Sequence, residues 1–140
     1  MAVGPSLRQL HSHKAIHEGG LSGAESKTAD VIAILKMEQP EKANEALEDL
    51  LDYWETRIIA HADSEEDGFY QEVVERNPEM QYKITQLIRD HDLLKILVAD
   101  IRSMHQEEGF SIGILHRLQA LIIVNEIHSR DEEKYLFEYE

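Results

Sequence analysis

Four successive segments of the chain repeat apolar residues at alternating intervals of three and four. This spacing places the apolar side chains along one face of an α-helix. No segment alternates apolar and polar residues with a period of two, so strands are not expected. Four long helices joined by short connections predict an all-α fold, an antiparallel up-down four-helix bundle that forms one domain over residues 1–140.

Proline and glycine divide the chain into these segments. Pro40 separates the first from the second, and Gly68 is expected to end the second. Pro78 suits the first turn of the third helix, Gly109 ends it, and Ser111 can cap the fourth. The expected helices span residues of about 6–37, 41–66, 79–107 and 112–138.

A histidine interrupts the apolar stripe of every segment, and in two segments a glutamate follows it by four residues. The histidines are His17, His61, His91 and His128. The glutamates are Glu65 and Glu132. Counted from the two hairpin turns at about 1.5 Å per residue, the histidines of each hairpin lie at similar depth. A buried carboxylate without a partner is very costly, so these residues are expected to meet around a cation.

The histidine–glutamate pair belongs to a longer motif that the chain repeats. Residues 61–70 read HADSEEDGFY and residues 128–137 read HSRDEEKYLF. Together with the two earlier histidines, the repeat predicts a near-twofold cage of nitrogen and oxygen ligands. This ligand set suits iron, manganese or zinc. Six protein ligands exceed what one tetrahedral zinc ion uses, so two metal ions fit better.

With these motifs the chain resembles the hemerythrin-like proteins, the family of HHE cation-binding domains, from about Leu7 to Phe137. The resemblance implies a four-helix bundle that holds a non-haem di-iron centre, bridged by two carboxylates and an oxo or hydroxo group. Carried over by position, the ligands would be His17, His61, Glu65, His91, His128 and Glu132.

The chain departs from the oxygen-carrying hemerythrins at one position. Their fifth histidine lies on the third helix, where this chain has Leu87, whereas here an extra histidine, His13, lies on the first helix. His13 could complete the same arrangement with its halves exchanged, so that one iron takes His13, His17 and His61. Alternatively, His13 orients a ligand, and a centre with four histidines would be closer to the iron-repair and iron-sensing members of the family.

Other residues near the motifs carry weaker expectations. Glu66 and Glu133 fall beside the stripe and are expected to be solvated or to orient a ligand. Tyr70 and Tyr135 are expected to pack at the end of the bundle. Gly19-Gly20, directly after His17, indicates either close approach of a neighbour or a local bend.

The resemblance implies a protein that binds or senses dioxygen, or a related small molecule such as nitric oxide. The expected apolar pocket would be lined by Leu21, Leu94, Leu121 and Val124. Two alternatives stay open. A di-iron oxidase, peroxidase or nitric-oxide-handling enzyme would need a proton donor near the metal. An iron storage, sensing or cluster-repair protein would hold its metal loosely.

Composition excludes several other classes. The chain has 28 acidic and 14 basic residues, and this charge of −14 repels nucleic acid and anionic membrane surfaces. It has no cysteine, which excludes disulfides and thiolate metal sites. No apolar run approaches the roughly 20 residues of a membrane span, and the N-terminus does not look like a signal peptide, so a cytoplasmic protein is expected.

Overall fold

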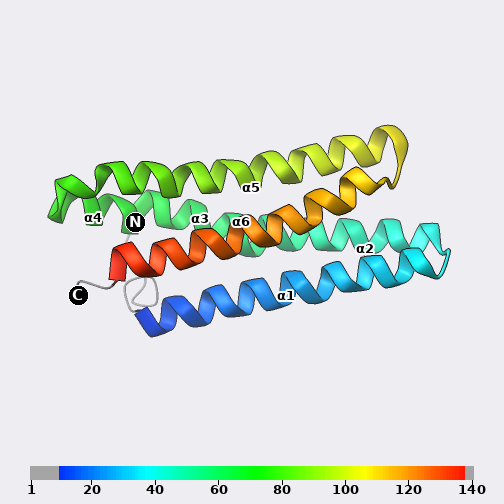
Figure 1. The fold of residues 1–140 in the computed structure, drawn as a ribbon, viewed down its shortest axis with the longest axis horizontal. Helices are drawn as coiled ribbons and strands as arrows, with labels where there is room; N and C mark the ends of the chain where they lie inside the picture. The colour runs from blue at the N-terminus through cyan, green and yellow to red at the C-terminus, as the bar shows by residue number, and fades with distance from the viewer. Residues whose placement is uncertain (1–9, 138–140) are drawn as a thin grey trace.

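The computed structural model describes residues 10–137, which form four long helical rods packed side by side and contain no strand (Figure 1). Along the chain the elements are α1 (Leu10–Lys36), α2 (Pro40–Tyr53), η2 (Trp54–Ile59), α3 (Ala60–Ser64), η3 (Glu65–Phe69), α4 (Tyr70–Arg76), η4 (Pro78–Met80), α5 (Gln81–Glu108) and α6 (Ile112–Phe137). The predicted all-α bundle is confirmed for this range. No helix in it is long and apolar enough to cross a membrane.

Successive rods run in opposite directions because tight turns join them. α1 packs against α2 and α6, and α5 packs against α6 and the second rod. In the turn after α1, Glu38 has a φ of 56°, and in the turn after α5, Gly109 has a φ of 76°. The Ser111 hydroxyl accepts a hydrogen bond from the N–H of Ile114 at 3.4 Å, which caps α6 as expected.

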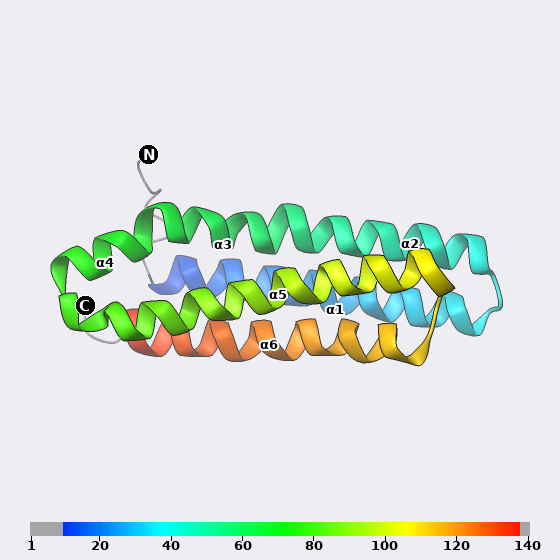
Figure 2. The same ribbon diagram turned by 90° about the horizontal axis from the view of Figure 1, so that it is seen from above.

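The second rod is longer than predicted. The expected end at Gly68 is wrong, because α2, η2, α3, η3 and α4 form one continuous helix to Arg76 (Figure 2). A glycine inside a helix costs about 1 kcal/mol. The two residues after it, Phe69 and Tyr70, are 4% and 1% exposed, and their burial offsets that cost. The helix ends at Asn77, since the ring of Pro78 disfavours helical geometry in the residue before it.

Two turns of the second rod are π-helical, η2 and η3, and they lie on either side of the short helix α3. A π turn holds more residues than an α turn, so it changes which side chains face the bundle interior. Trp54, Ala62 and Glu65 are all buried along this rod. The corresponding motif on α6 lies in an uninterrupted α-helix. The two copies of the motif therefore have different backbones.

The interior has two apolar parts with a polar layer between them. The large apolar cluster fills the end near the turns after α1 and α5, and it consists of Ala24, Val31, Leu47, Leu50, Leu51, Trp54, Leu94, Val98, Ile101, Ile114, Leu118 and Leu121. The small apolar cluster fills the other end and consists of Phe69, Tyr70, Ile84, Leu87, Leu136 and Phe137. The polar layer contains His13, Glu65, His91, His128 and Glu132, all of them buried.

Candidate metal centre

The four rods bring seven histidine and glutamate side chains to one level of the bundle. Their ligand atoms form two groups, and within each group all the atoms lie within 4.8 Å of one another. The first group is His13, His17, His61 and Glu65. The second group is Glu65, His91, His128 and Glu132. The structure thus brings together every residue predicted as a candidate ligand, and each group could hold a metal ion.

The two carboxylates lie between the groups. Glu65 belongs to both, with Oε2 at 3.0 Å from His13 Nε2 and Oε1 at 3.5 Å from His91 Nε2. Glu132 also contacts both groups. Its Oε1 accepts a hydrogen bond from His13 Nε2 and lies 3.2 Å from His17 Nε2. Its Oε2 lies 3.2 Å from His128 Nε2. A carboxylate with one oxygen toward each group is suited to bridge two cations.

One histidine at this level lacks a hydrogen-bond partner. His61 Nε2 is buried, lies 3.4 Å from Glu65 Oε2, and makes no hydrogen bond. A buried polar atom without a partner costs about 1–3 kcal/mol. The Nε2 atoms of His91 and His128 also converge to 3.0 Å. Two cations would provide partners for all of these atoms, so the donor set fits a pair of metal ions.

Carboxylates outside the two groups hold three of the histidine rings. The Nδ1 atoms of His17, His91 and His128 donate hydrogen bonds to three acidic side chains. These bonds run to Glu133 Oε2 at 2.7 Å, Glu66 Oε2 at 2.7 Å and Asp90 Oδ2 at 2.9 Å, respectively. A hydrogen bond at Nδ1 leaves Nε2 free to bind a cation and directs it inward. Of the two roles expected for Glu66 and Glu133, the structure shows the orienting one.

Asp90 was not predicted. It lies on α5 directly before His91, yet it binds the ring of His128 on α6. The depth count that pairs His91 with His128 also places Asp90 at the level of His128. The apolar stripe does not include Asp90, which lies beside it, so the stripe alone does not predict this contact.

Without metal, protons on the buried histidines balance the negative charge of the two buried glutamates. Burial opposes a charge on His13, but hydrogen bonds with Glu132 and Glu65 and their negative charges outweigh it and raise the His13 pKa to about 9. Burial likewise opposes a charge on His128, and its contacts with Asp90 and Glu132 raise its pKa to about 10. Burial would raise the pKa of each glutamate, yet the surrounding histidines hold the pKa of Glu65 below its ordinary value and that of Glu132 well below it.

Tyr70 belongs to this site as well as to the small apolar cluster. Its hydroxyl donates a hydrogen bond to Glu132 Oε2 and lies 3.4 Å from His91 Nε2. Its ring stacks on the His91 ring with centroids 5.6 Å apart. Burial and the charge of Glu132 raise the Tyr70 pKa well above its ordinary value, so the hydroxyl keeps its proton. Tyr135 does not share this position, because its ring packs under Lys83 Nζ at 3.8 Å.

Alignment of the two motif copies could have shown this difference. Tyr70 in the first copy corresponds to Phe137 in the second. The Phe137 ring lies 4.8 Å from that of His13, whereas the Tyr70 hydroxyl reaches the second group. The centre is therefore asymmetric, with an extra imidazole on one side and a phenol on the other.

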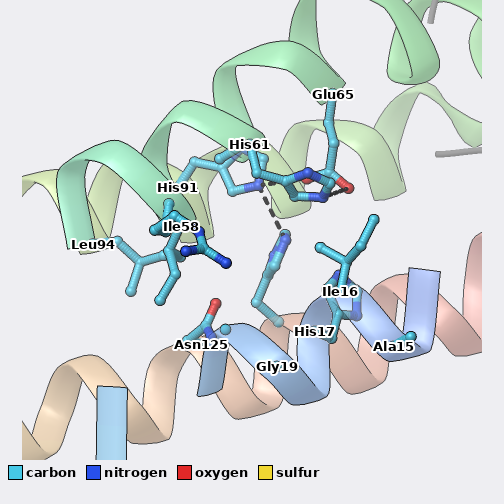
Figure 3. Close-up of a pocket in the computed structure, with 14 residues that line it drawn as sticks. Ala15, Ile16, His17, Gly19, Ile58, His61, Glu65, His91, Leu94 and Asn125 are labelled. Carbon is cyan, nitrogen blue, oxygen red and sulfur yellow. Dashed lines mark hydrogen bonds and ion pairs between the residues drawn. The ribbon is translucent and has the colours of Figure 1, made fainter. Parts of the chain in front are cut away.

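A pocket of about 220 Å³ opens onto both groups (Figure 3). Site residues in its wall are His17, His61, Glu65, His91 and His128. The rest of the wall is mostly apolar, as the sequence suggested, but other residues than expected supply it, among them Ile16, Ile58 and Ala62. Of the four candidate leucine and valine residues only Leu94 lines it, and Leu121 lies in the large apolar cluster instead. Arg57 and Asn125 supply polar groups.

The consecutive glycines Gly19 and Gly20 also form part of the pocket wall. Their carbonyl oxygens face the second rod, where the Tyr53 hydroxyl donates to Gly20 O at 3.0 Å and contacts Gly19 O at 3.3 Å. A Cβ atom on Gly20 would lie 3.6 Å from Ile58, which is ordinary van der Waals contact. A Cβ atom on Gly19 would meet nothing within 4 Å, so close approach of a neighbour does not account for these two glycines.

Comparison of the chain with models of protein families, with curated proteins and with solved structures finds no match. The hemerythrin-like resemblance therefore stays a prediction carried by the two motifs.

Proposed function

We propose that the protein binds a pair of iron ions between its four helices and uses them to bind or sense a small molecule such as dioxygen or nitric oxide. The observation that carries this proposal is the pair of ligand groups that share Glu65, with His61 Nε2 buried and without a hydrogen bond. Manganese and zinc accept the same nitrogen and oxygen donors, so the experiment must compare the three metals.

Each part of the site has a role in this function. His13, His17 and His61 would hold one ion, and His91 and His128 the other. The two carboxylates would bridge them, and the outer carboxylates keep the rings in place. Iron, when bound, would supply the electrons that dioxygen accepts. The pocket gives a small molecule access to the histidine side of the centre.

Metal analysis tests the proposal directly. The metal-free protein is incubated separately with ferrous iron, manganese and zinc, and bound metal per chain is measured. We expect two ions per chain, with iron retained best against a chelator. Glu65→Gln should hold fewer than one, because both groups lose a ligand. Asp67→Asn is the matched control, since Asp67 is exposed on the same rod. Wild-type protein with no bound metal would overturn the proposal.

Binding of dioxygen is tested on the iron-loaded protein prepared without oxygen. A change in the visible spectrum that appears with oxygen and reverses on degassing supports reversible binding. A chain that releases its iron to a mild chelator within minutes supports an iron-handling role instead.

The position of Tyr70 supports a second candidate, an enzyme that reduces dioxygen or peroxide. Such chemistry needs a positioned proton donor, and the Tyr70 hydroxyl lies inside the site, hydrogen-bonded to Glu132. If the protein is an enzyme, Tyr70→Phe should lower the rate of peroxide consumption by about 100-fold or more with iron content unchanged. If the wild-type protein consumes peroxide no faster than free iron does, the protein is not this kind of enzyme.

A further inference from the structure

The large apolar side chains that remain on the surface gather on one face of the bundle. Among residues 12–137, six such side chains are exposed, and α1 and the second rod contribute none of them. Met37 lies in the turn after α1. The other five lie on α5 and α6, and they are Tyr82, Ile96, Ile112, Ile123 and Ile127. These two helices lie side by side in both views of the fold (Figures 1 and 2), and an exposed apolar face of this kind marks an interaction surface.

The contact between His91 and His128, whose Nε2 atoms lie 3.0 Å apart, fixes the level of α5 against α6. Toward the turn after α5, Ile96 lies five residues from His91 and Ile123 lies five residues from His128, so these two isoleucines are level. Ile127 lies one turn from Ile123 on the same side of α6. The exposed fractions of Ile96, Ile123 and Ile127 are 45%, 55% and 41%, respectively. Together they form an isoleucine patch near the middle of the face.

Opposite charges lie on either side of the isoleucine patch on α5. Arg89 precedes Ile96 by seven residues and Asp100 follows it by four, so all three share the outward side of the helix. Both charged side chains are exposed, and neither forms an ion pair with another residue of the range 10–137. Arg130 on α6 is level with Arg89, because each lies two residues from the histidine contact on the side away from the turn. The face is therefore basic at one end of the patch and, on α5, acidic at the other.

The face matches a copy of itself that is turned end for end. A twofold axis running across the two helices would place α5 on α5 and α6 on α6, with the levels reversed. Along α5, the midpoint between Arg89 and Asp100 lies between three and four residues past His91. The midpoint between Ile123 and Ile127 on α6 lies within one residue of the same level. An axis at this level would bring Arg89 opposite Asp100 of the second copy, and Ile123 opposite Ile127 of the second copy.

Charge disfavours the other twofold arrangement, in which the axis runs parallel to the helices. That axis would set α5 of one copy on α6 of the other, with equal levels in contact. Arg89 would then meet Arg130 of the second copy, and like charges that face each other across an interface repel.

The size of the face also suits a dimer. It extends from Tyr82, nine residues from the histidine contact on one side, to Ile112, sixteen residues from it on the other. At 1.5 Å per residue its length is about 38 Å, and two helices about 10 Å apart make it about 20 Å wide. The resulting area of about 750 Å² per copy is close to the value of about 800 Å² per partner that is typical of stable interfaces. The end-for-end axis would also bring Tyr82 level with Ile112 of the second copy.

We propose that the outward face of α5 and α6 binds a second copy of this chain in the end-for-end arrangement and so forms a dimer. The isoleucine patch supplies the apolar contact, and the two pairs of Arg89 with Asp100 define the direction. His91 and His128 lie on the inner side of the same two helices, so the dimer needs no metal and does not depend on the proposed function.

Sedimentation equilibrium of the full chain tests the proposal. In about 0.15 M salt the Debye length is about 8 Å, which screens the charge of −14 on each copy. We expect a dimer with a dissociation constant of about 1–100 µM, at the weak end for interfaces of this size. Ile123→Glu places two charges in the isoleucine patch of each dimer and should weaken association by about 100-fold or more. Met37→Glu is the matched control, since it adds the same charge at an exposed apolar residue outside the face, and it should change association by less than about threefold. Both variants should keep the helical content of the wild type, measured by circular dichroism, because both positions are exposed.

Exchange of the charges on α5 tests the direction of the dimer. Arg89→Asp should weaken association about 5- to 50-fold, because two carboxylates would then face each other at each end of the patch. Adding Asp100→Arg should restore association to within about threefold of wild type, which a general effect on folding would not do. A chain that stays monomeric up to about 500 µM, or a dimer that Ile123→Glu leaves intact, would overturn the proposal. An Arg89→Asp dimer tighter than that of the wild type would show the parallel arrangement and overturn the end-for-end one.

Discussion

Three carboxylates outside the two ligand groups orient three of the histidine rings in the candidate centre. Asp90, Glu66 and Glu133 each accept a hydrogen bond from Nδ1 of a histidine on another helix. This contact holds the ring in one tautomer and raises the basicity of Nε2. Each also ties two rods together at the level of the polar layer. A metal ion entering this site meets rings that are already oriented, and their ordering costs little when it binds.

Asp90 provides the sharpest test of this orientation. Asp90→Asn keeps the size of the side chain and removes the charge that faces His128 Nδ1. We expect metal affinity to fall about 10- to 100-fold, the usual effect of such outer partners. Affinity is measured by competition with a chelator of known strength. Asp92→Asn is the control, because Asp92 is exposed on the same helix and should leave affinity unchanged. Equal affinity in Asp90→Asn and wild type would show that the contact does not orient the ring.

At the scale of the helices, the apolar stripe proved a good guide to which residues face inward. It placed His61 and Glu65 in the interior because the average spacing of three and four persists across the second rod. It could not show η2 and η3, since a π turn adds only a local offset that the sequence does not mark. Gly68 looked like a helix end because its local preference opposes a helix, whereas the burial of the residues that follow it depends on contacts with distant parts of the chain.

The same limit applies to the pocket and to Tyr70. Periodicity shows that a residue faces the bundle interior, but it does not show which other interior residues its side chain contacts. Leu121 is buried as expected, yet it packs in the large apolar cluster rather than in the pocket wall. The Tyr70 hydroxyl reaches the carboxylate of Glu132 on a different helix, and this contact follows from packing that the spacing alone does not define.

A prediction at this scale concerns the close packing of α1 against the second rod. A Cβ atom on Gly23 would lie 2.1 Å from the Tyr53 hydroxyl oxygen, whose hydrogen bond to Gly20 O holds it in place. Gly23→Ala should therefore lower the free energy of unfolding by about 1–3 kcal/mol. A Cβ atom on Gly19 meets nothing within 4 Å, so Gly19→Ala should raise it by about 0.4–1 kcal/mol. Urea unfolding of the metal-free variants measures both. A Gly23→Ala protein as stable as wild type would contradict the tight contact.

At the scale of the whole molecule, the polar layer makes stability depend on pH in opposite ways with and without metal. In the metal-free protein the pKa values of His13 and His128 are raised to about 9 and about 10. A raised pKa in the folded state adds stability that is complete below the ordinary histidine value of 6.5 and is lost as pH rises through the folded value. The lowered pKa values of Glu65 and Glu132 add stability that is lost in acid.

The metal-free protein should therefore lose stability steadily as pH rises from about 6.5 to about 10. The metal-loaded protein should gain stability over the lower part of the same range, because protons compete with the metal for the imidazoles. Urea unfolding across this range, with chelator present in one series and metal in the other, measures the two trends. A metal-free protein whose stability does not change between neutral and alkaline pH would contradict the proton pairing.

The position of the polar layer also makes the two ends of the molecule unequal. Among residues 10–137, six buried apolar side chains pack together on one side of the layer, whereas twelve pack together on the other. A bound pair of cations would link all four helices, and its removal would leave the smaller end held by the small apolar cluster and the proton-paired residues of the polar layer. That end would then unfold locally before the larger one, so the mobility of one end of the protein would depend on the supply of metal in its surroundings.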